Sequence, residues 1–139
     1  MSYLSAELRR QVTERAQNCC EYCRIHNDDH YLPHEIDHII PEKHRGATDA
    51  SNLCLSCFDC NRYKGSDVGS FDVETGEFAL LFNPRAMQWI AHFRLDVATI
   101  IPLTPEGRVT VFLLRSNSEN RLIRRRALIE LRRYPWPSS

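Results

Sequence analysis

The chain has 139 residues, the length of a single domain, and its 42% hydrophobic and 26% charged residues are ordinary for a soluble globular protein. No apolar run approaches the roughly 18–20 residues that cross a membrane. The opening residues MSYLSAELRR lack the basic and then apolar pattern of a signal peptide, so we expect a cytoplasmic protein with no membrane partner. The formal net charge of zero does not by itself indicate nucleic-acid binding, although residues 116–139 hold six arginines against two acids.

The first half of the chain predicts the order helix, loop, strand, loop, strand, helix. A helix is expected from an N-cap at Ser5 to about residue 17, because Leu8, Val12 and Ala16 recur on one face. Four elements then follow: a polar loop at 24–34, a strand at 34–40 ended by Pro41, a short antiparallel strand at 52–56, and two turns of helix at 58–64 stopped by Gly65.

The second half predicts a less regular series of elements. These are a hairpin at 70–82 turning at 74–76, a strand at 87–93, a helix with N-cap Thr104 and Pro105 in its first turn, and a helix at 118–133. For the third element a strand remains the alternative, because Val109, Val111 and Leu113 alternate.

The last predicted helix has two possible roles. Its apolar residues Ile123, Ala127 and Leu131 fall on one side, which predicts that this side packs on the domain. The other side carries the arginines that we consider as DNA contacts: Arg121, Arg125 and Arg132.

Six cysteines are the strongest chemical signal in the sequence. Cys20 and Cys23 form one CxxC pair, Cys57 and Cys60 form a second, and 33 residues lie between the two pairs. Two such turns can present four thiolates to one ion, and a closed four-thiolate shell is typical of structural Zn²⁺. The sequence therefore predicts a structural zinc site on these four cysteines.

Two other ligand sets compete with this assignment. Cys54 and Cys57 also form a CxxC, but the apolar neighbours of Cys54 favour a buried free thiol. His26 and His30 could join the first cysteine pair, but that set leaves the second pair unexplained. We expect Cys19 to take no part as a ligand.

The segments CEYC, EIDHIIP and SNLCLSCFDCNRYKG resemble, in order and spacing, the HNH endonuclease family in its four-cysteine zinc form. The rest of the chain loosely resembles small stand-alone bacterial members. The resemblance implies an α+β fold: one domain over 1–139, with a zinc-stapled ββα-metal core at 18–66, an N-terminal helix, and an α/β extension of hairpin and helices at 67–139.

The resemblance also implies the roles of the site residues. His38, Asn52 and Asn61 stand at the three positions that name the family, the third being asparagine instead of histidine. His38 would be the general base, Asp37 and Asn61 would hold one catalytic Mg²⁺ or Mn²⁺, and Asn52 would fix the loop that places His38. Arg45 departs from the family, which often has glycine at this position.

The implied activity is metal-dependent hydrolysis of phosphodiester bonds in DNA, with RNA not excluded. Arg62 and Lys64 follow Asn61 on the short helix and are expected to contact phosphates beside the cut. The alternative function is a zinc-stapled nucleic-acid-binding module without turnover, which would have no need for the acid, the imidazole and the amide together. The oligomeric state is left open.

Overall fold

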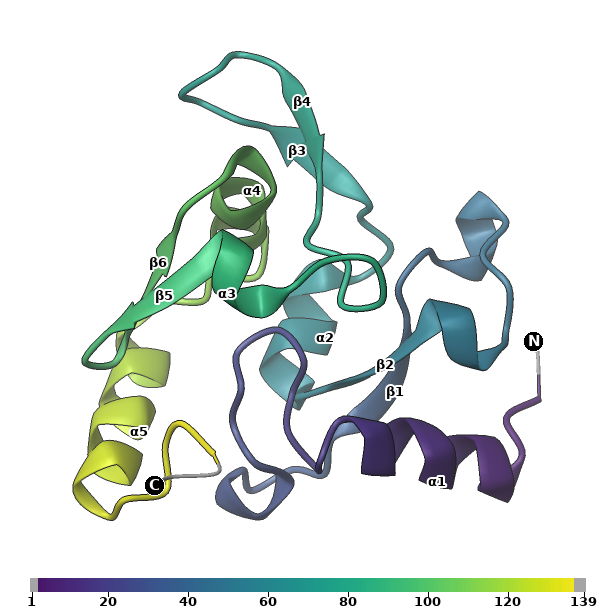
Figure 1. Ribbon diagram of the computed structural model, residues 1–139, viewed down its shortest axis with the longest axis horizontal. Coiled ribbons are helices and arrows are strands. Elements are labelled where there is room, and N and C mark those ends of the chain that lie inside the picture. The colour runs from purple at the N-terminus through teal and green to yellow at the C-terminus, as the bar shows by residue number, and fades with distance from the viewer. Residues whose placement is uncertain (1–2, 137–139) are drawn as a thin grey trace.

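The computed structural model describes residues 3–136, and a small ββα unit lies at its centre (Figure 1). Strands β1 (Glu35–His38) and β2 (Leu53–Ser56) pair antiparallel, with Asp37 opposite Cys54. Helix α2 (Phe58–Lys64) follows β2 directly. The predicted order of strand, loop, strand and helix is therefore confirmed.

Helix α1 (Ala6–Arg15) begins where the sequence predicts, because the hydroxyl of Ser5 accepts a hydrogen bond of 3.1 Å from the amide of Leu8. Val12 is its buried residue, and the helix packs against β2. Arg15 at its last turn donates to the carbonyl oxygen of Leu53, at 2.7 Å. This bond connects the end of α1 to the start of β2.

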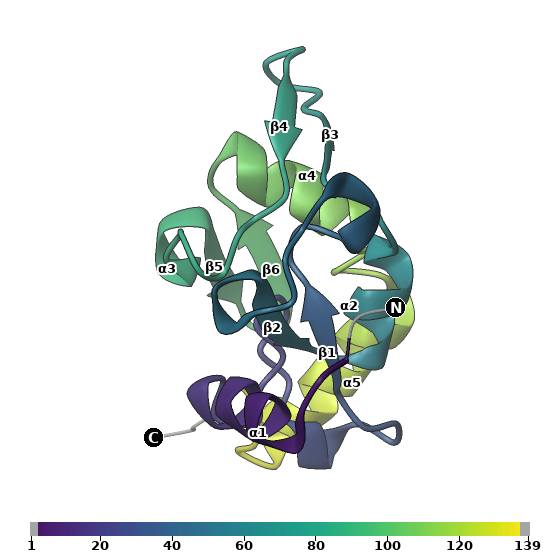
Figure 2. The ribbon, with the colours of Figure 1, turned by 90° about the vertical axis from the view of Figure 1, so that its right-hand side faces the viewer.

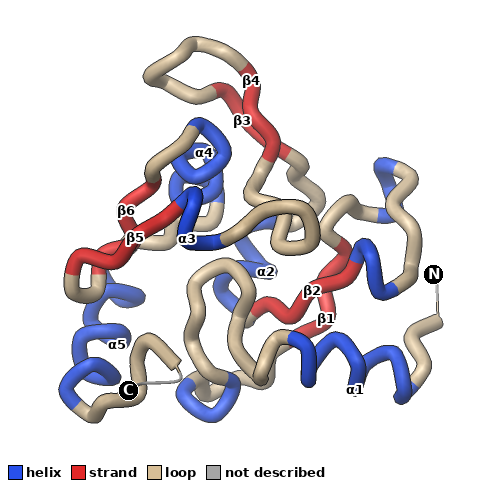
Figure 3. The backbone as a smooth tube through the Cα atoms, viewed as in Figure 1, coloured by secondary structure: helices blue, strands red, loops and turns tan. Residues whose placement is uncertain are grey.

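Between α2 and residue 136, the extension contains two further hairpins and three α-helices. Their bounds are β3 Gly69–Phe71, β4 Phe78–Leu80, α3 Trp89–His92, β5 Phe93–Asp96, β6 Thr99–Pro102, α4 Pro105–Leu113 and α5 Glu119–Glu130. The strands make three separate two-stranded antiparallel sheets (Figure 3). The β3–β4 hairpin projects from one end of the molecule and α1 lies at the other (Figure 2).

The segment 87–93 differs from its prediction as a strand. Most of it is α3, and only Phe93 begins β5. The indole nitrogen of Trp89 donates to the carbonyl oxygen of Tyr22 at 2.9 Å, and its ring lies 5.1 Å from that of Phe93. Long-range contacts of this aromatic residue hold a helical turn that the short apolar sequence does not reveal.

Helix α4 resolves the alternative that the sequence left open. The hydroxyl of Thr104 accepts a 3.0 Å hydrogen bond from the amide of Gly107, and Pro105 occupies the first turn. Val109 is buried against the core, whereas Phe112 is exposed. The alternation of apolar residues here therefore belongs to a helix.

The predicted apolar face of α5 is wrong. Ile123 is 54% exposed and Leu131 is 71% exposed, whereas Arg121 and Arg125 are 5% and 2% exposed. The helix is turned so that these two arginines and Leu128 face inward. The physical reason is that both guanidinium groups have buried partners: Arg121 donates to Sγ of Cys60, and Arg125 donates to the carbonyl oxygens of Ala98 and Ser116.

One hydrophobic cluster joins the ββα unit to the extension. It includes Tyr22 and Ile39 from the first half, with Phe82, Phe93 and Leu128 from the second. None of the helices in residues 3–136 combines the length and the apolar character needed to cross a membrane.

Candidate functional site

The four predicted zinc ligands come together in the structure. The sulfur atoms of Cys20, Cys23, Cys57 and Cys60 all lie within 4.8 Å of one another, and every one of these residues is buried. The Sγ atoms of Cys23 and Cys57 are 3.7 Å apart. Zn–S bonds of about 2.3 Å in a tetrahedron place the sulfurs about 3.8 Å apart, so the cluster fits one Zn²⁺.

Each CxxC pair is built as a tight turn around its first sulfur. The amide of Cys23 donates to Sγ of Cys20, and the amide of Cys60 donates to Sγ of Cys57, both at 3.4 Å. Cys57 is also the N-cap of α2. The second turn is thus continuous with the helix that carries Asn61, so a bound zinc would fix the start of that helix.

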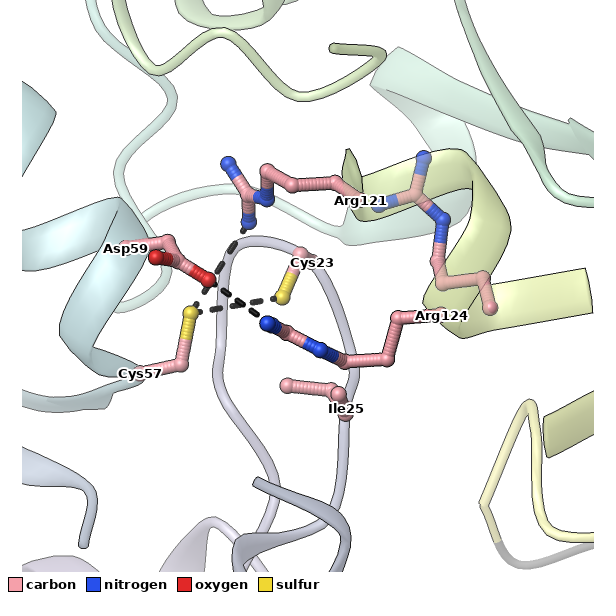
Figure 4. A pocket seen from close by; sticks show the side chains of 7 residues that line it. Cys23, Ile25, Cys57, Asp59, Arg121 and Arg124 are labelled. Carbon is pink, nitrogen blue, oxygen red and sulfur yellow. Dashed lines mark hydrogen bonds and ion pairs between the residues drawn. The ribbon is translucent and has the colours of Figure 1, made fainter. Parts of the chain in front are cut away.

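Arg121 lies against the sulfur cluster from α5 (Figure 4). Its Nη2 donates to Sγ of Cys60 at 2.9 Å and lies 3.8 Å from Sγ of Cys57, while its Nη1 donates to the carbonyl oxygen of Leu114 at 2.7 Å. No carboxylate within residues 3–136 forms an ion pair with Arg121.

The burial of Arg121 beside these sulfur atoms favours negative charge on them. Burial opposes its charged form, but the thiolates of Cys60, Cys23 and Cys57 outweigh burial and raise the pKa of Arg121 well above its ordinary value. An unpaired buried charge is costly, and four neutral thiols would not compensate it. Thiolates held by a metal ion account for the arrangement.

A second arginine of α5, Arg124, contacts the turn formed by Cys57 to Cys60. Arg124 donates to Oδ2 of Asp59 at 2.8 Å, and Nε2 of His30 lies 3.1 Å from the same oxygen. Figure 4 shows Asp59 beside Cys57, with Arg124 reaching toward it. The C-terminal helix thus contacts the cluster through a thiolate and through a carboxylate within the CxxC turn.

The competing ligands have other partners. His30 is bound to Asp59, and Nδ1 of His26 accepts a 3.0 Å hydrogen bond from the amide of Asp28. Cys54 is fully buried, and burial raises its pKa well above the ordinary value. Burial also raises the pKa of Cys19 to about 11. Neither histidine and neither of these thiols belongs to the metal-sized cluster.

Asp37 faces α2 from the middle of β1. It is 9% exposed, and Nζ of Lys64 lies 3.0 Å from its Oδ2. This contact is an ion pair without hydrogen-bond geometry, so Oδ2 is a buried oxygen with no hydrogen bond among the described residues. Burial raises the pKa of Asp37, and the ammonium of Lys64 opposes that rise.

The role expected for Lys64 needs correction. We predicted a phosphate contact, but Lys64 is 1% exposed, and its Nζ also donates to the carbonyl oxygen of His38 at 2.9 Å. Its ammonium is held by two groups on β1 and is not presented to solvent. Lys64 therefore connects the end of α2 to the end of β1.

Asn61 faces β1 from the helix side. Its Nδ2 donates to Oε2 of Glu35, a residue that the sequence analysis did not single out. Residues two apart on a strand share a face, and residues three apart on a helix share a face. Glu35 and Asp37 on β1 therefore meet Asn61 and Lys64 on α2.

The donors on this face suit a hard divalent cation. Asp37 offers a buried carboxylate oxygen without a hydrogen bond, and Asn61 has its amide oxygen remaining. Mg²⁺ and Mn²⁺ prefer oxygen ligands of this kind and retain water in the other positions.

His38 points away from this face, as alternation along a strand requires. Its Nε2 lies 2.8 Å from Oγ1 of Thr48 and 3.7 Å from Oε1 of Glu42. Both partners belong to the loop between β1 and β2, so the loop sets the orientation of the ring. Thr48 is a further residue that the sequence did not reveal, because its contact depends on how this loop closes.

Asn52 closes the loop with three hydrogen bonds of 2.9 Å. Its Nδ2 donates to the carbonyl oxygens of Ile40 and Ala47, and its Oδ1 accepts from the amide of Ile40. A Cβ at Gly46 would lie 1.6 Å from the carbonyl oxygen of Ile40, so only glycine fits there. The hydrogen bonds of the Asn52 side chain are thus all made within the loop between β1 and β2.

Arg45 takes the left-handed backbone conformation, with φ of 72°. Glycine adopts this conformation freely, whereas another residue loses about 1 kcal/mol or more. The loop therefore keeps the geometry that a glycine would allow, and the departure at Arg45 shows as local strain.

Of the other basic residues predicted to contact nucleic acid, one is buried and two are exposed. Arg125 donates to the carbonyl oxygens of Ala98 at 2.7 Å and Ser116 at 2.8 Å, so it, like Arg121, is committed to the fold. We therefore withdraw these two arginines as DNA contacts. Arg62 and Arg132 are exposed, and their predicted contacts with nucleic acid stay predictions.

Comparison with known proteins agrees with this geometry. Residues 20–67 match the family model described as HNH endonuclease. No curated protein and no solved structure matches the chain significantly. The match spans the four cysteines, both strands of the central unit and α2. Residues 20–67 are thus similar to the HNH endonuclease family, and the four buried cysteines within them fit its four-cysteine zinc form.

Proposed function

We propose that the protein is a metal-dependent HNH endonuclease that hydrolyses phosphodiester bonds in DNA. The observation that carries this proposal is that adjacent residues of β1 place an acid and an imidazole on opposite faces of the strand. Asp37 and Asn61 both lie where β1 meets α2, Asp37 beside Lys64 and Asn61 beside Glu35, while the next residue, His38, contacts Thr48 of the loop. A packing role alone does not require an acid, an imidazole and an amide at these places.

The chemistry assigns each group a task. A divalent cation held by Asp37 and Asn61 would stabilise the negative charge that develops on the phosphoryl and leaving oxygens. His38 accepts the proton of the attacking water, and histidine suits this role because its side chain titrates near neutrality. In the tautomer whose Nε2–H donates a hydrogen bond to Oγ1 of Thr48, Nδ1 carries no proton and is the basic nitrogen.

The zinc site has a structural role in this proposal. Its four-thiolate shell leaves no open position for a substrate. It fixes the start of α2, and α2 in turn presents Asn61 toward β1. Zinc therefore supports the catalytic geometry from a distance and takes no part in the hydrolysis.

The proposed nucleic-acid surface surrounds the loop and α2. Arg62 is exposed next to Asn61, and Lys43 and Arg45 are exposed on the loop that orients His38. Positive charge at these places would contact phosphates on either side of the cut. Arg132, exposed after α5, remains a further proposed contact.

The test is nicking of supercoiled plasmid by purified protein with Mg²⁺ or Mn²⁺. We expect cutting that EDTA stops before zinc is lost, because a hard cation on two protein ligands dissociates faster than Zn²⁺ from a four-thiolate cage. Asn61→Ala should raise the metal concentration needed for cutting. Salt-dependent DNA binding without any cutting would instead establish the binding module without turnover.

A further inference from the structure

Glu35 controls which end of the Asn61 amide faces the proposed cation. A side-chain amide has a donor end and an acceptor end, and only the oxygen can bind a metal ion. The carboxylate of Glu35 accepts from Nδ2 of Asn61. The donor end is therefore held against Glu35, which leaves Oδ1 directed to the remaining space. Without this contact, the amide could turn its NH₂ group toward the cation.

Glu35 also changes the charge of the site. Asp37 is the only carboxylate that we assigned to the cation, and the ammonium of Lys64 lies 3.0 Å from it. This pair is neutral overall, so it provides little attraction for a doubly charged ion. Glu35 adds one negative charge on the same face of β1, and that charge favours a cation beside the Asp37 carboxylate.

The fold itself does not account for the Glu35 carboxylate. The residue is exposed, and no lysine, arginine or histidine within residues 3–136 forms an ion pair with it. Its contribution to β1 is made by the backbone, which pairs with Ser56. The contact between its side chain and Asn61 is therefore the feature to explain.

We propose that Glu35 is a positioning residue of the divalent-cation site, which orients Asn61 and supplies the net negative charge that the Asp37–Lys64 pair lacks. This inference rests on the proposed function, since it concerns the same cation. It extends that function by naming a third side chain on which cation affinity depends.

The experiment measures Mn²⁺ binding to the zinc-loaded protein by electron paramagnetic resonance, without any substrate. Glu35→Ala removes both the hydrogen bond and the charge, and should weaken Mn²⁺ binding about 10-fold or more, the effect expected for a group that orients a metal ligand. Glu35→Gln keeps an acceptor for Asn61 and should fall between wild type and Glu35→Ala. Glu130→Gln, an exposed change of equal charge on α5, is the matched control and should bind as wild type does.

A double substitution distinguishes positioning from a general loss of structure. Glu35→Gln combined with Asn61→Asp restores the net charge and reverses the donor and acceptor across the same contact. We expect the double variant to bind Mn²⁺ more tightly than Glu35→Gln alone. Glu35→Ala combined with Asn61→Asp has the same net charge and the same carboxylate at position 61 but no donor at position 35, so it is the reference for this recovery. Equal Mn²⁺ binding by the two double variants would overturn the positioning role of residue 35.

Two results separate this inference from the proposed function. If Asn61→Ala weakens Mn²⁺ binding while Glu35→Ala binds within about twofold of wild type, the cation site stands and the role of Glu35 is refuted. If neither Asn61→Ala nor Asp37→Asn changes Mn²⁺ binding, the cation site itself is refuted, and the role of Glu35 with it. Thermal unfolding of each variant checks that the compared proteins are folded.

Discussion

Replacing Arg121 with methionine tests whether α5 stabilises the zinc site through charge. Four thiolates around one Zn²⁺ carry a formal charge of −2, and Arg121 is the cation whose Nη2 lies 2.9 Å from Sγ of Cys60. A hydrogen bond to a charged group contributes about 1.5–3 kcal/mol. That range corresponds to about 10- to 150-fold in the dissociation constant for zinc.

The assay is transfer of zinc from the purified holoprotein to a chromophoric chelator of known affinity. Arg126→Met is the control, because Arg126 is exposed on the same helix and the substitution removes the same charge. Arg121→Met also leaves the carbonyl oxygen of Leu114 without its 2.7 Å donor, which lowers stability as well. Arg121→Lys keeps a positive charge without the planar guanidinium group, so its zinc affinity should lie between wild type and Arg121→Met.

Equal zinc affinity of wild type, Arg121→Lys and Arg121→Met would refute the reasoning. It would mean that the contact between Arg121 and Cys60 adds nothing to metal retention, and that burial of the guanidinium group is explained by packing. Equal losses in Arg121→Met and Arg126→Met would also contradict it, because the effect would then belong to the overall charge of the helix.

Two further predictions concern the hairpin and the loop. The Arg108 guanidinium holds the pKa of Asp72 well below its usual range, so the pair stabilises the fold above the unfolded-state pKa of about 3.9 and loses that contribution as the pH falls toward the folded-state value. The melting temperatures of wild type and Asp72→Asn should therefore converge between pH 5 and pH 2, and a constant gap would contradict this. Thr48→Val removes the partner of His38 and should lower kcat about tenfold, the cost of one hydrogen bond, with zinc content and DNA affinity preserved; an unchanged kcat would show that the loop does not orient the ring.

The central unit could be predicted because its signals are local or fixed by spacing. Ser5 and Gly65 mark helix ends because helix capping depends on the capping residue and its immediate neighbours in the sequence. The two CxxC pairs predicted that residues 20–23 and 57–60 lie together in space, because four thiolates that share one metal ion have to be close to one another. Strand alternation then placed Asp37 and His38 on opposite faces.

The orientation of α5 could not be predicted, because hydrophobicity assigns arginine to the surface. Arg121 is buried because its partner is a cysteine cluster 61 residues away in the sequence, whose charge depends on a bound metal. Ile123 is exposed for the same reason, since the helix can turn only one face inward. No pattern within the helix contains this information.

The same limit applies to the face of β1 that packs against α2. The sequence predicts Lys64 as a surface residue, but in the structure it is buried against Asp37. The sequence likewise predicts Glu35 on the solvent side of a strand, but in the structure its carboxylate contacts Asn61. These pairs join segments that are 26–27 residues apart, so their contacts emerge only from the tertiary fold. The division of the chain into a core at 18–66 and an extension at 67–139 stays a prediction.

The most direct test of the central claim compares His38→Ala with wild type in one plasmid-nicking assay at saturating Mg²⁺, with contaminating nuclease excluded. Loss of a general base should slow cutting by about 100-fold or more, while zinc content, DNA affinity and Mn²⁺ binding stay at wild-type levels because other residues provide them. Equal cutting rates for the two proteins would show that His38 is not the base and would contradict the nuclease assignment of this site.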